Sequence, residues 1–285
     1  MKIKKLLCLA LAFIMVLALS ACGNSPTPTQ PTPGSETSGQ TDPDTNAAPE
    51  ETFVFRHGFD LDYPPYSYLD DNGNIGGFDV EMCQALCDYL GWEYVAVPFN
   101  WDAKDMELNS GAADCIWSGF TIEGREDSYE WSIAYSDNTQ MILVPNDSDI
   151  KTLEDLAGKV IGVQTSTSAY DLLMKEGSAQ AELCATFAEL MIYDTYTIAF
   201  ADLQAGAIDA IAIDITVGNF LIDGVEGYGY LDEVLGIESY GIGFRLGDTE
   251  LRDTVNEALL ALVADGTYDA IGQKYPTIYD YLCLN

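Results

Sequence analysis

Two spacings of apolar residues alternate along the chain after about residue 52. Short apolar runs, typical of buried strands, are separated by stretches in which apolar residues recur every three or four positions, as on one face of a helix. Phe78, Met82, Leu86 and Leu90 show the helical spacing, and Gly91 follows as a stop signal. The predicted strands are 53–57, 94–97, 115–117, 141–144, 160–163, 191–193, 210–213 and 240–244. The predicted helices are 78–90, 102–110, 153–156, 168–175, 196–204, 216–222, 251–264 and 268–275.

This alternation of strands and helices predicts an α/β fold with mainly parallel sheets. Nearly half of the residues, 48%, are apolar, so a packed interior can form. The folded part, residues 52–285, exceeds the commonest size of a single domain, which favours two lobes with separate cores. We expect lobe 1 to comprise 52–142 and 242–285, and lobe 2 to comprise 143–241, so that two strands cross between them.

A short internal repeat, here called the echo, predicts how the two lobes face each other. Residues 108–119 read LNSGAADCIWSG and residues 203–214 read LQAGAIDAIAID, with Leu, Gly, Ala, Asp and Ile at the same offsets. Each unit predicts a helix end, a glycine stop, a turn and a buried strand. Ligands of open α/β sheets bind beyond the carboxyl ends of strands. The echo therefore predicts that Gly119 and Asp214, at the two strand ends, face one cleft.

The N-terminal segment has the composition of an export signal. Lysines at 2, 4 and 5 precede an apolar run over 6–19, which is too short for a comfortable membrane span. Small residues then precede Cys22, as in the bacterial lipoprotein box, so residues 1–21 are predicted to be a lipoprotein signal peptide and Cys22 the lipidated residue. An ordinary secretory leader is the alternative. Residues 22–51, rich in Pro, Thr, Ser and Gly, predict a disordered, lipid-anchored linker.

Charge and cysteine content narrow the possible partners. Of the 12 lysines and arginines, Lys2, Lys4 and Lys5 belong to the predicted leader, which leaves nine against 46 acidic residues. Such an acidic chain repels nucleic acid, and we expect no nucleic-acid partner. Five cysteines remain beyond Cys22 in no metal-binding pattern, and buried free thiols are expected, with one disulfide as the alternative. They are Cys83, Cys87, Cys115, Cys184 and Cys283.

Among the scarce cations, Arg125 follows a strand-like run and lies near small and hydroxylated residues. A guanidinium can hold both oxygens of a carboxylate through parallel hydrogen bonds. A surface ion pair with Glu123 or Glu126 is the alternative. A cation on one side of a cleft and Asp214 on the other would suit a zwitterion such as an α-amino acid.

Distributed motifs resemble the family 3 extracellular solute-binding proteins, the polar amino-acid receptors of ABC importers. The resemblance runs from about residue 53 to 275 and rests on six segments. They are DLDYPPYSY (60–68), GGFDV (76–80), SGFTIEGR (118–125), TLEDLAGKVIGVQ (152–164), LQAGAIDAIAID (203–214) and ADGTY (264–268). The loop 121–125 is one residue shorter than the commoner pattern, and Ser166 replaces a usual glycine.

The resemblance implies a two-lobed, type II periplasmic-binding-protein-like fold that closes on an amino acid, without catalytic residues, metal or cofactor. Arg125 would bind the α-carboxylate with backbone N–H groups of Thr167 and Ser168, and Asp214 would bind the α-ammonium. Asp214 could also, or instead, cap the helix after it. Gly119 would offer backbone groups and Thr121 its hydroxyl. Tyr63, Tyr66 and Trp101 would wall the side-chain pocket, and Asp60 would face a cationic side chain or be structural.

The chain is therefore expected to be a monomeric, lipid-anchored protein outside the cytoplasm that delivers its ligand to an ABC permease. A sensory amino-acid-binding protein is a second interpretation that the sequence does not separate from the first. A dehydratase-type enzyme on the same fold is a third. It would need a general acid or base in the cleft, and the one histidine, His57, lies in a predicted buried strand, where a core role is favoured.

Overall fold

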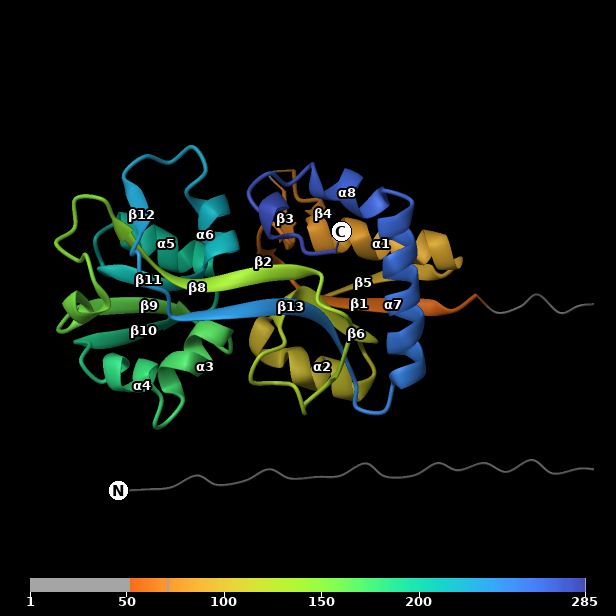
Figure 1. The fold of residues 1–285 in the computed structure, drawn as a ribbon, viewed down its shortest axis with the longest axis horizontal. Coiled ribbons are helices and arrows are strands. Elements are labelled where there is room, and N and C mark those ends of the chain that lie inside the picture. Colours follow the sequence, from red (N-terminus) through yellow and green to blue (C-terminus); the bar gives the residue numbers. More distant parts are fainter. Residues whose placement is uncertain (1–51, 71, 285) are drawn as a thin grey trace, which may run out of the picture. The chain divides into compact units, whose positions relative to one another are not determined.

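The computed structural model describes residues 52–70 and 72–284. The predicted signal peptide and the whole predicted linker, Cys22 included, lie outside these residues. A mixed sheet of ten strands passes through both lobes in the order β10-β9-β11-β8-β13-β6-β1-β5, with β12 added on β8 and β7 on β13 (Figure 1). A separate small sheet has the order β2-β3-β4.

Lobe 1 is built on parallel pairing of β1 with β5 and with β6. Helices α1 and α8 lie on one side of this part of the sheet, and α2 lies on the other (Figure 1). Its strands are β1 (Val54–Asp60), β2 (Asp62–Tyr63), β3 (Ser67–Leu69), β4 (Ile75–Gly76), β5 (Glu93–Phe99), β6 (Cys115–Thr121) and β7 (Glu130–Trp131). Its helices are α1 (Phe78–Leu90), α2 (Lys104–Ser110), α7 (Thr249–Ala264) and α8 (Thr267–Gly272), with 3₁₀ turns at Trp101–Ala103 and Tyr279–Tyr281.

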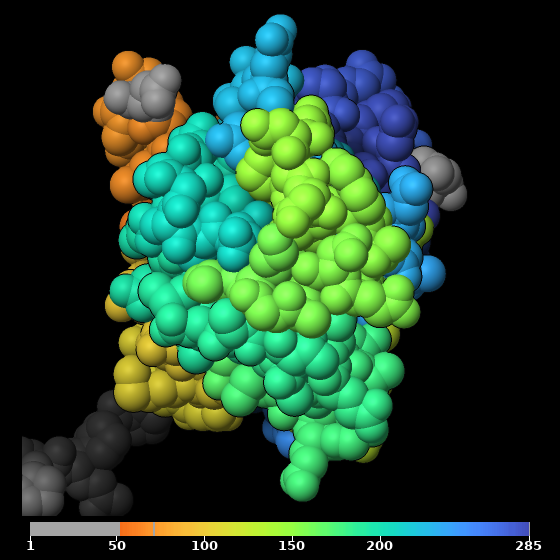
Figure 2. Space-filling view, turned by 90° about the vertical axis from the view of Figure 1, so that its left-hand side faces the viewer, coloured from red at the N-terminus to blue at the C-terminus, as the bar shows by residue number. Residues whose placement is uncertain are grey.

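Lobe 2 repeats this plan, with β9 paired in parallel with β10 and with β11. Helices α5 and α6 lie on one side of the sheet and α3 and α4 on the other (Figure 1). Figure 2 views the molecule from this lobe, whose surface is coloured green to cyan. Its strands are β9 (Val160–Gln164), β10 (Glu189–Tyr193), β11 (Ala210–Asp214) and β12 (Tyr228–Tyr230). Its helices are α3 (Ser168–Met174), α4 (Ala179–Cys184), α5 (Tyr196–Gln204) and α6 (Ile215–Leu221), with a 3₁₀ turn at Leu153–Leu156.

Two long antiparallel strands, β8 (Ser136–Pro145) and β13 (Gly236–Phe244), run from one lobe into the other (Figure 1). Pairing of β8 with β11 of lobe 2 begins at Gln140, and pairing of β13 with β6 of lobe 1 begins at Tyr240. The predicted lobe boundaries at 142 and 241 lie within these strands. The mainly parallel sheet expected from the sequence is therefore mixed, because the crossing strands are antiparallel to their neighbours.

One buried apolar cluster runs through both lobes and a second lies within lobe 2, so the two fully separate cores expected from the sequence are not what the structure has. In lobe 1, α1 begins after Gly77 and ends at Gly91, whose left-handed conformation (φ 67°) closes the helix. This helix buries Met82 and Leu86 against Trp117 and its neighbours, whereas Ile161, Val163 and Leu173 lie in the core of lobe 2. The predicted helices 78–90 and 196–204 agree with the observed α1 and α5, but the last predicted helix, 268–275, ends already at Gly272. No helix in the described part of the chain is long and apolar enough to cross a membrane.

Candidate functional site

A small enclosed cavity of about 10 Å³, room for about one water molecule, lies where the two lobes meet. Eight of the ten ligand residues predicted from the sequence line it. They are Tyr63, Trp101, Gly119, Thr121 and Arg125 from lobe 1, and Thr167, Ser168 and Asp214 from lobe 2. Asp60 and Tyr66 are absent from its wall. Because the cavity is so small, an amino acid can enter only when the lobes move apart.

Asp214 presents an unused carboxylate oxygen at this cavity. The residue ends β11 and is 1% exposed. Its Oδ1 accepts hydrogen bonds from Asn138 Nδ2 (2.8 Å), Gln140 Nε2 (2.5 Å) and the Tyr240 hydroxyl (2.7 Å). Its Oδ2 is buried and has no hydrogen-bond partner among residues 52–70 and 72–284. Asp214 occupies the N-cap position of α6, but its side chain makes no capping bond, so the carboxylate is directed elsewhere.

Arg125 lies at the rim of the cavity, in the loop after β6, with its guanidinium 5.4 Å from the centre of the Phe120 ring. Its Nη2 forms an ion pair with Asp171 of lobe 2 at 2.5 Å, not with Glu123 or Glu126, the alternatives suggested by the sequence. The same nitrogen lies 3.5 Å from the Ser166 carbonyl oxygen, and Nη1 lies 3.4 Å from that of Thr121. The guanidinium therefore already bridges the two lobes.

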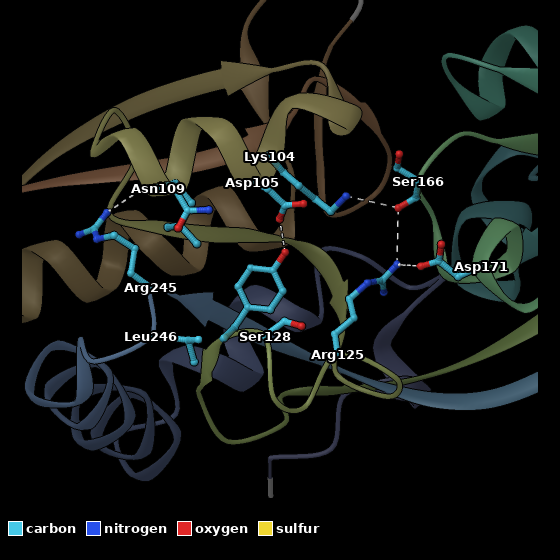
Figure 3. Close-up of a pocket in the computed structure, with 11 residues that line it drawn as sticks. Lys104, Asp105, Asn109, Arg125, Ser128, Ser166, Asp171, Arg245 and Leu246 are labelled. Carbon is cyan, nitrogen blue, oxygen red and sulfur yellow. Dashed lines mark hydrogen bonds and ion pairs between the residues drawn. The ribbon is translucent and has the colours of Figure 1, made fainter. Parts of the chain in front are cut away.

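Several donors of lobe 1 approach the Ser166 carbonyl oxygen of lobe 2. It accepts a hydrogen bond from Trp101 Nε1 at 2.9 Å, and Lys104 Nζ lies 3.5 Å away (Figure 3). Ser166 has a positive φ of 58°, in the left-handed region that favours glycine, which accounts for the glycine usual at this place in similar sequences. A wider surface groove runs outward from here between Lys104, Arg125 and Arg245, and Arg125 borders both the groove and the cavity (Figure 3).

Gly119 and Tyr63 are in close contact on the lobe 1 wall. Gly119 has φ of 55°, and a Cβ atom added there would lie 2.5 Å from Tyr63 Cε1. Its N–H donates to Asp79 Oδ2 at 2.8 Å and is therefore not free to bind a ligand. Burial raises the pKa of Asp79 to about 8. Asp79 comes from the GFD motif at the start of α1, which explains how that motif fixes the end of β6.

Aromatic rings form the rest of the lobe 1 wall. Tyr63 stacks on Trp101 with ring centres 6.4 Å apart and an angle of 10° between the planes. Tyr66, predicted to share this wall, lies behind it, where its hydroxyl is 3.0 Å from Ser136 Oγ and its ring contacts Tyr240 edge-on. Asp60, also outside the wall, accepts a hydrogen bond across the lobes from Gln164 Nε2 at 3.0 Å, and burial raises its pKa to about 6.

Thr167 and Ser168 begin α3 on the lobe 2 side. Thr167 is the N-cap, and its hydroxyl oxygen accepts from Tyr170 N and donates to the Gln164 carbonyl. The Ser168 hydroxyl donates to Glu238. Both side chains are therefore engaged within the protein, and their backbone N–H groups are what they can offer a carboxylate.

Sequence reasoning missed three polar residues on the crossing strands. Asn138 and Gln140 lie two apart on β8, and Glu238 lies opposite Asn138 on β13. The two amide groups each donate to Asp214 Oδ1 and to Glu238 Oε1. The signal was the alternation of polar residues in segments adjoining apolar runs, because residues two apart on a strand share a face.

His57 lies away from the cavity. It is fully buried on β1, its Nε2 lies 2.7 Å from the Trp117 carbonyl oxygen, and burial lowers its pKa to about 4. The expected core role of this residue is confirmed, and it is not placed to serve as an acid or base in the cleft.

Comparison with known proteins now decides the family. The model of the bacterial extracellular solute-binding proteins, family 3, matches residues 55–277. The chain belongs to this family. It is 30% identical over 222 residues to the L-cystine-binding protein TcyJ of Escherichia coli strain K12, an alignment that covers 76% of this chain and 80% of TcyJ.

Solved structures of family-like proteins share the two-lobed, type II fold. A substrate-binding protein of an ABC uptake transporter from Streptococcus pneumoniae, with bound histidine, aligns with a TM-score of 0.73 and 30% identity over 78% of this chain and 92% of that chain. A mutant of ArgBP from T. maritima aligns with a TM-score of 0.71 and 32% identity over 79% and 95%. The fold predicted from the sequence is thereby confirmed.

Proposed function

We propose that this family member is the substrate-binding protein of an ABC importer and captures a polar amino acid between its lobes. The observation that carries the proposal is the pair of opposite charges at one cavity, Arg125 at the rim and the free Oδ2 of Asp214 at the floor. A guanidinium matches a carboxylate, and a buried carboxylate oxygen matches an ammonium group. The two groups come from different lobes, so a zwitterion that contacts both stabilises the closed arrangement.

Ligand binding then involves two contacts, one at each end of the zwitterion. The α-ammonium group contacts Asp214 Oδ2, with the Gly119 carbonyl and the Thr121 hydroxyl oxygen as further acceptors. The α-carboxylate binds Arg125 in place of Asp171, an exposed carboxylate with 57% of its side chain accessible. Asp171 regains water contacts when the ligand displaces it, so the exchange costs less than breaking a pair in which both charges are buried. Backbone N–H groups at Thr167 and Ser168 complete the carboxylate site.

The side-chain pocket begins between Tyr63 and Trp101. Relatives are named for cystine, histidine and arginine binding, which supports a polar ligand for this chain. Asp60, behind this wall, links the lobes through Gln164, so the structural role left open by the sequence has a defined contact. A ligand with a cationic side chain would reach Asp60 by displacing Gln164.

The proposal includes a membrane anchor and a permease partner. The signal-peptide pattern of residues 1–21 and the cysteine at 22 support lipidation of Cys22, and the segment 22–51 would then serve as a tether. Held in this way outside the cytoplasm, a monomer in its closed form would dock on the permease.

Calorimetry of residues 52–285 against the twenty amino acids tests the binding function. We expect at least one polar amino acid to bind with a Kd below about 100 μM, roughly 5.5 kcal/mol. Arg125→Ala should abolish that binding with an unchanged circular dichroism spectrum. The matched control is Arg252→Ala, which removes an arginine paired with Glu130 in lobe 1, away from the cavity, and should bind as the wild type does. Absence of binding to all twenty would refute the proposal.

A further inference from the structure

The crossing strands bring a second carboxylate to the floor of the cleft. In the register of the sheet, Glu238 lies opposite Asn138, and Gln140 lies opposite Asp214. These side chains meet on one face, where both amides donate to both carboxylates. Glu238 is 4% exposed and forms no salt bridge with any residue in the described ranges.

The carboxylate of Glu238 touches hydroxyl groups of both lobes. Its Oε1 accepts from Thr121 Oγ1 of lobe 1 at 3.1 Å, and its Oε2 accepts from the Ser168 hydroxyl of lobe 2. Both hydroxyls also line the cavity. A hydroxyl has one proton and two lone pairs, so a hydroxyl that donates to Glu238 can only accept from whatever occupies the cavity.

An ionised Glu238 therefore makes the floor of the cavity an array of acceptors. The Oδ2 atom of Asp214, which has no partner among the described residues, and the lone pairs of the Thr121 and Ser168 hydroxyls can each accept a hydrogen bond from a ligand. Two buried negative charges are also costly unless a cation lies beside them. A primary ammonium group, with three N–H donors and a positive charge, satisfies both requirements.

We propose that Glu238 is a positioning residue for the ligand's ammonium group, which it serves by orienting the hydroxyls of Thr121 and Ser168 and by adding its charge to that of Asp214. The inference rests on the proposed function, because it concerns the same cavity. It assigns to a crossing strand, and not only to the two lobes, a part in choosing the ligand.

The charge of Glu238 depends on pH in the physiological range. Burial, and then the nearby Asp214, raise its pKa to about 7. The other titratable groups that face it are Tyr63 on β2, Tyr196 on α5 and Tyr240 on its own strand, whose pKa values burial raises well above 10, so they stay neutral. An arriving ammonium group stabilises the ionised form of Glu238, so binding releases a proton. If the pKa falls by about one unit in the complex, affinity should rise about fivefold between pH 6 and pH 8.

The test is the Kd of the bound amino acid at pH 6, 7 and 8 for the wild type and for Glu238→Gln. The substitution keeps the shape and removes the charge. We expect wild type and variant to bind nearly equally at pH 6, where Glu238 is largely protonated, and to differ by about tenfold at pH 8. A purely structural role would instead weaken binding by the same factor at every pH.

A matched control makes the result specific. Glu123→Gln serves this purpose, because Glu123 accepts from the N–H of Ser239, next to Glu238, but is exposed and outside the cavity. It should reproduce the wild-type pH profile.

The inference is overturned if Glu238→Gln retains the wild-type slope, if it loses affinity uniformly, or if Glu123→Gln flattens the profile. In these cases the wild type still binds its ligand, and the proposed function stands. If the wild type binds no amino acid at any of the three pH values, the proposed function and this inference both fail.

Discussion

The two strand ends at the cavity, β6 in lobe 1 and β11 in lobe 2, have the same surroundings and opposite chemistry. Each strand begins within one copy of the sequence echo and lies between a parallel neighbour, β1 or β9, and an antiparallel crossing strand, β13 or β8. Beyond β6, the chain passes through a glycine-containing loop to Arg125. Beyond β11, it turns directly into α6, so Asp214 itself is the strand end.

Because of this difference, Asp214 is a fixed contact and Arg125 is an adjustable one. Asp214 is fully buried and held by three donors, whereas Arg125 sits on a loop at the rim and pairs with an exposed carboxylate of the other lobe. The ammonium end of a zwitterion would meet a preformed site. The carboxylate end would be captured as the lobes close. The following predictions test this contrast, from the largest expected effect to the smallest.

Asp214→Asn should weaken amino-acid binding by about 100-fold or more, because it removes the buried charge nearest the ammonium group and leaves only Glu238, which reaches the ligand through hydroxyl groups. Calorimetry measures the loss. The control is Asp209→Asn. Asp209 is exposed, lies just before β11, and accepts a hydrogen bond from the backbone N–H of Val160 on β9. A loss below threefold in Asp214→Asn would show that the fixed site lies elsewhere.

Arg125→Lys should weaken binding by about tenfold, less than the change at Asp214. Lysine keeps the positive charge but cannot form two parallel hydrogen bonds with a carboxylate. If Arg125→Lys bound more weakly than Asp214→Asn, the rim would be the dominant contact and the contrast would be reversed.

Gly119→Ala should lower the free energy of unfolding by about 1–2 kcal/mol and weaken binding several-fold, because a Cβ there combines a left-handed backbone with a clash against Tyr63. Denaturant unfolding and calorimetry measure the two effects. Gly124→Ala is the matched control, with φ of 81° but no atom within 4 Å of the added Cβ, so it carries backbone strain alone. If Gly119→Ala and Gly124→Ala bound the ligand equally well, the proposed contact between Tyr63 and the ligand would be contradicted.

Asp60→Asn should change the affinity for a ligand with a neutral side chain by less than about threefold, because Asp60 lies behind the cavity wall. It should raise the free energy of unfolding by about 1 kcal/mol at pH 7.5. The sign follows from the raised pKa of about 6: the buried ionised carboxyl costs stability above pH 6, and the cost vanishes below the unfolded value of 3.8. The gain should therefore disappear at pH 3.5, and a gain that persists there would have another cause.

The sequence predicted those parts of the fold in which the apolar pattern reports burial. Helix α1 shows this well, because its apolar face and glycine stop are both local. The first halves of the crossing strands were missed, since residues 136–140 are all polar although three of the five are buried, and among 236–239 only the charged Glu238 is buried. Burial of polar residues there depends on partners about a hundred positions away, as between Asn138 and Glu238, which no local pattern reveals.

The same reasoning explains the site. Eight predicted residues line the cavity, because most of them lie at or near strand ends and helix starts that converge on it, and Arg125 lies in the loop that follows β6. The family resemblance implies Tyr66 as a wall residue, but its side chain is fully buried behind the wall, against Ser136 and Tyr240. Asp171, the present partner of Arg125, could not be foreseen, because it comes from a helix of the opposite lobe.

The most direct test of the central claim, that one zwitterion spans Asp214 and Arg125, compares ligand analogues across variants. Calorimetry would measure the bound amino acid, the 2-hydroxy acid that lacks its ammonium group, and the amine that lacks its carboxylate, with wild type, Asp214→Asn and Arg125→Lys. The account predicts that loss of the ammonium group costs far less affinity in Asp214→Asn than in wild type, and that loss of the carboxylate costs less in Arg125→Lys. Equal costs in all three proteins would contradict it.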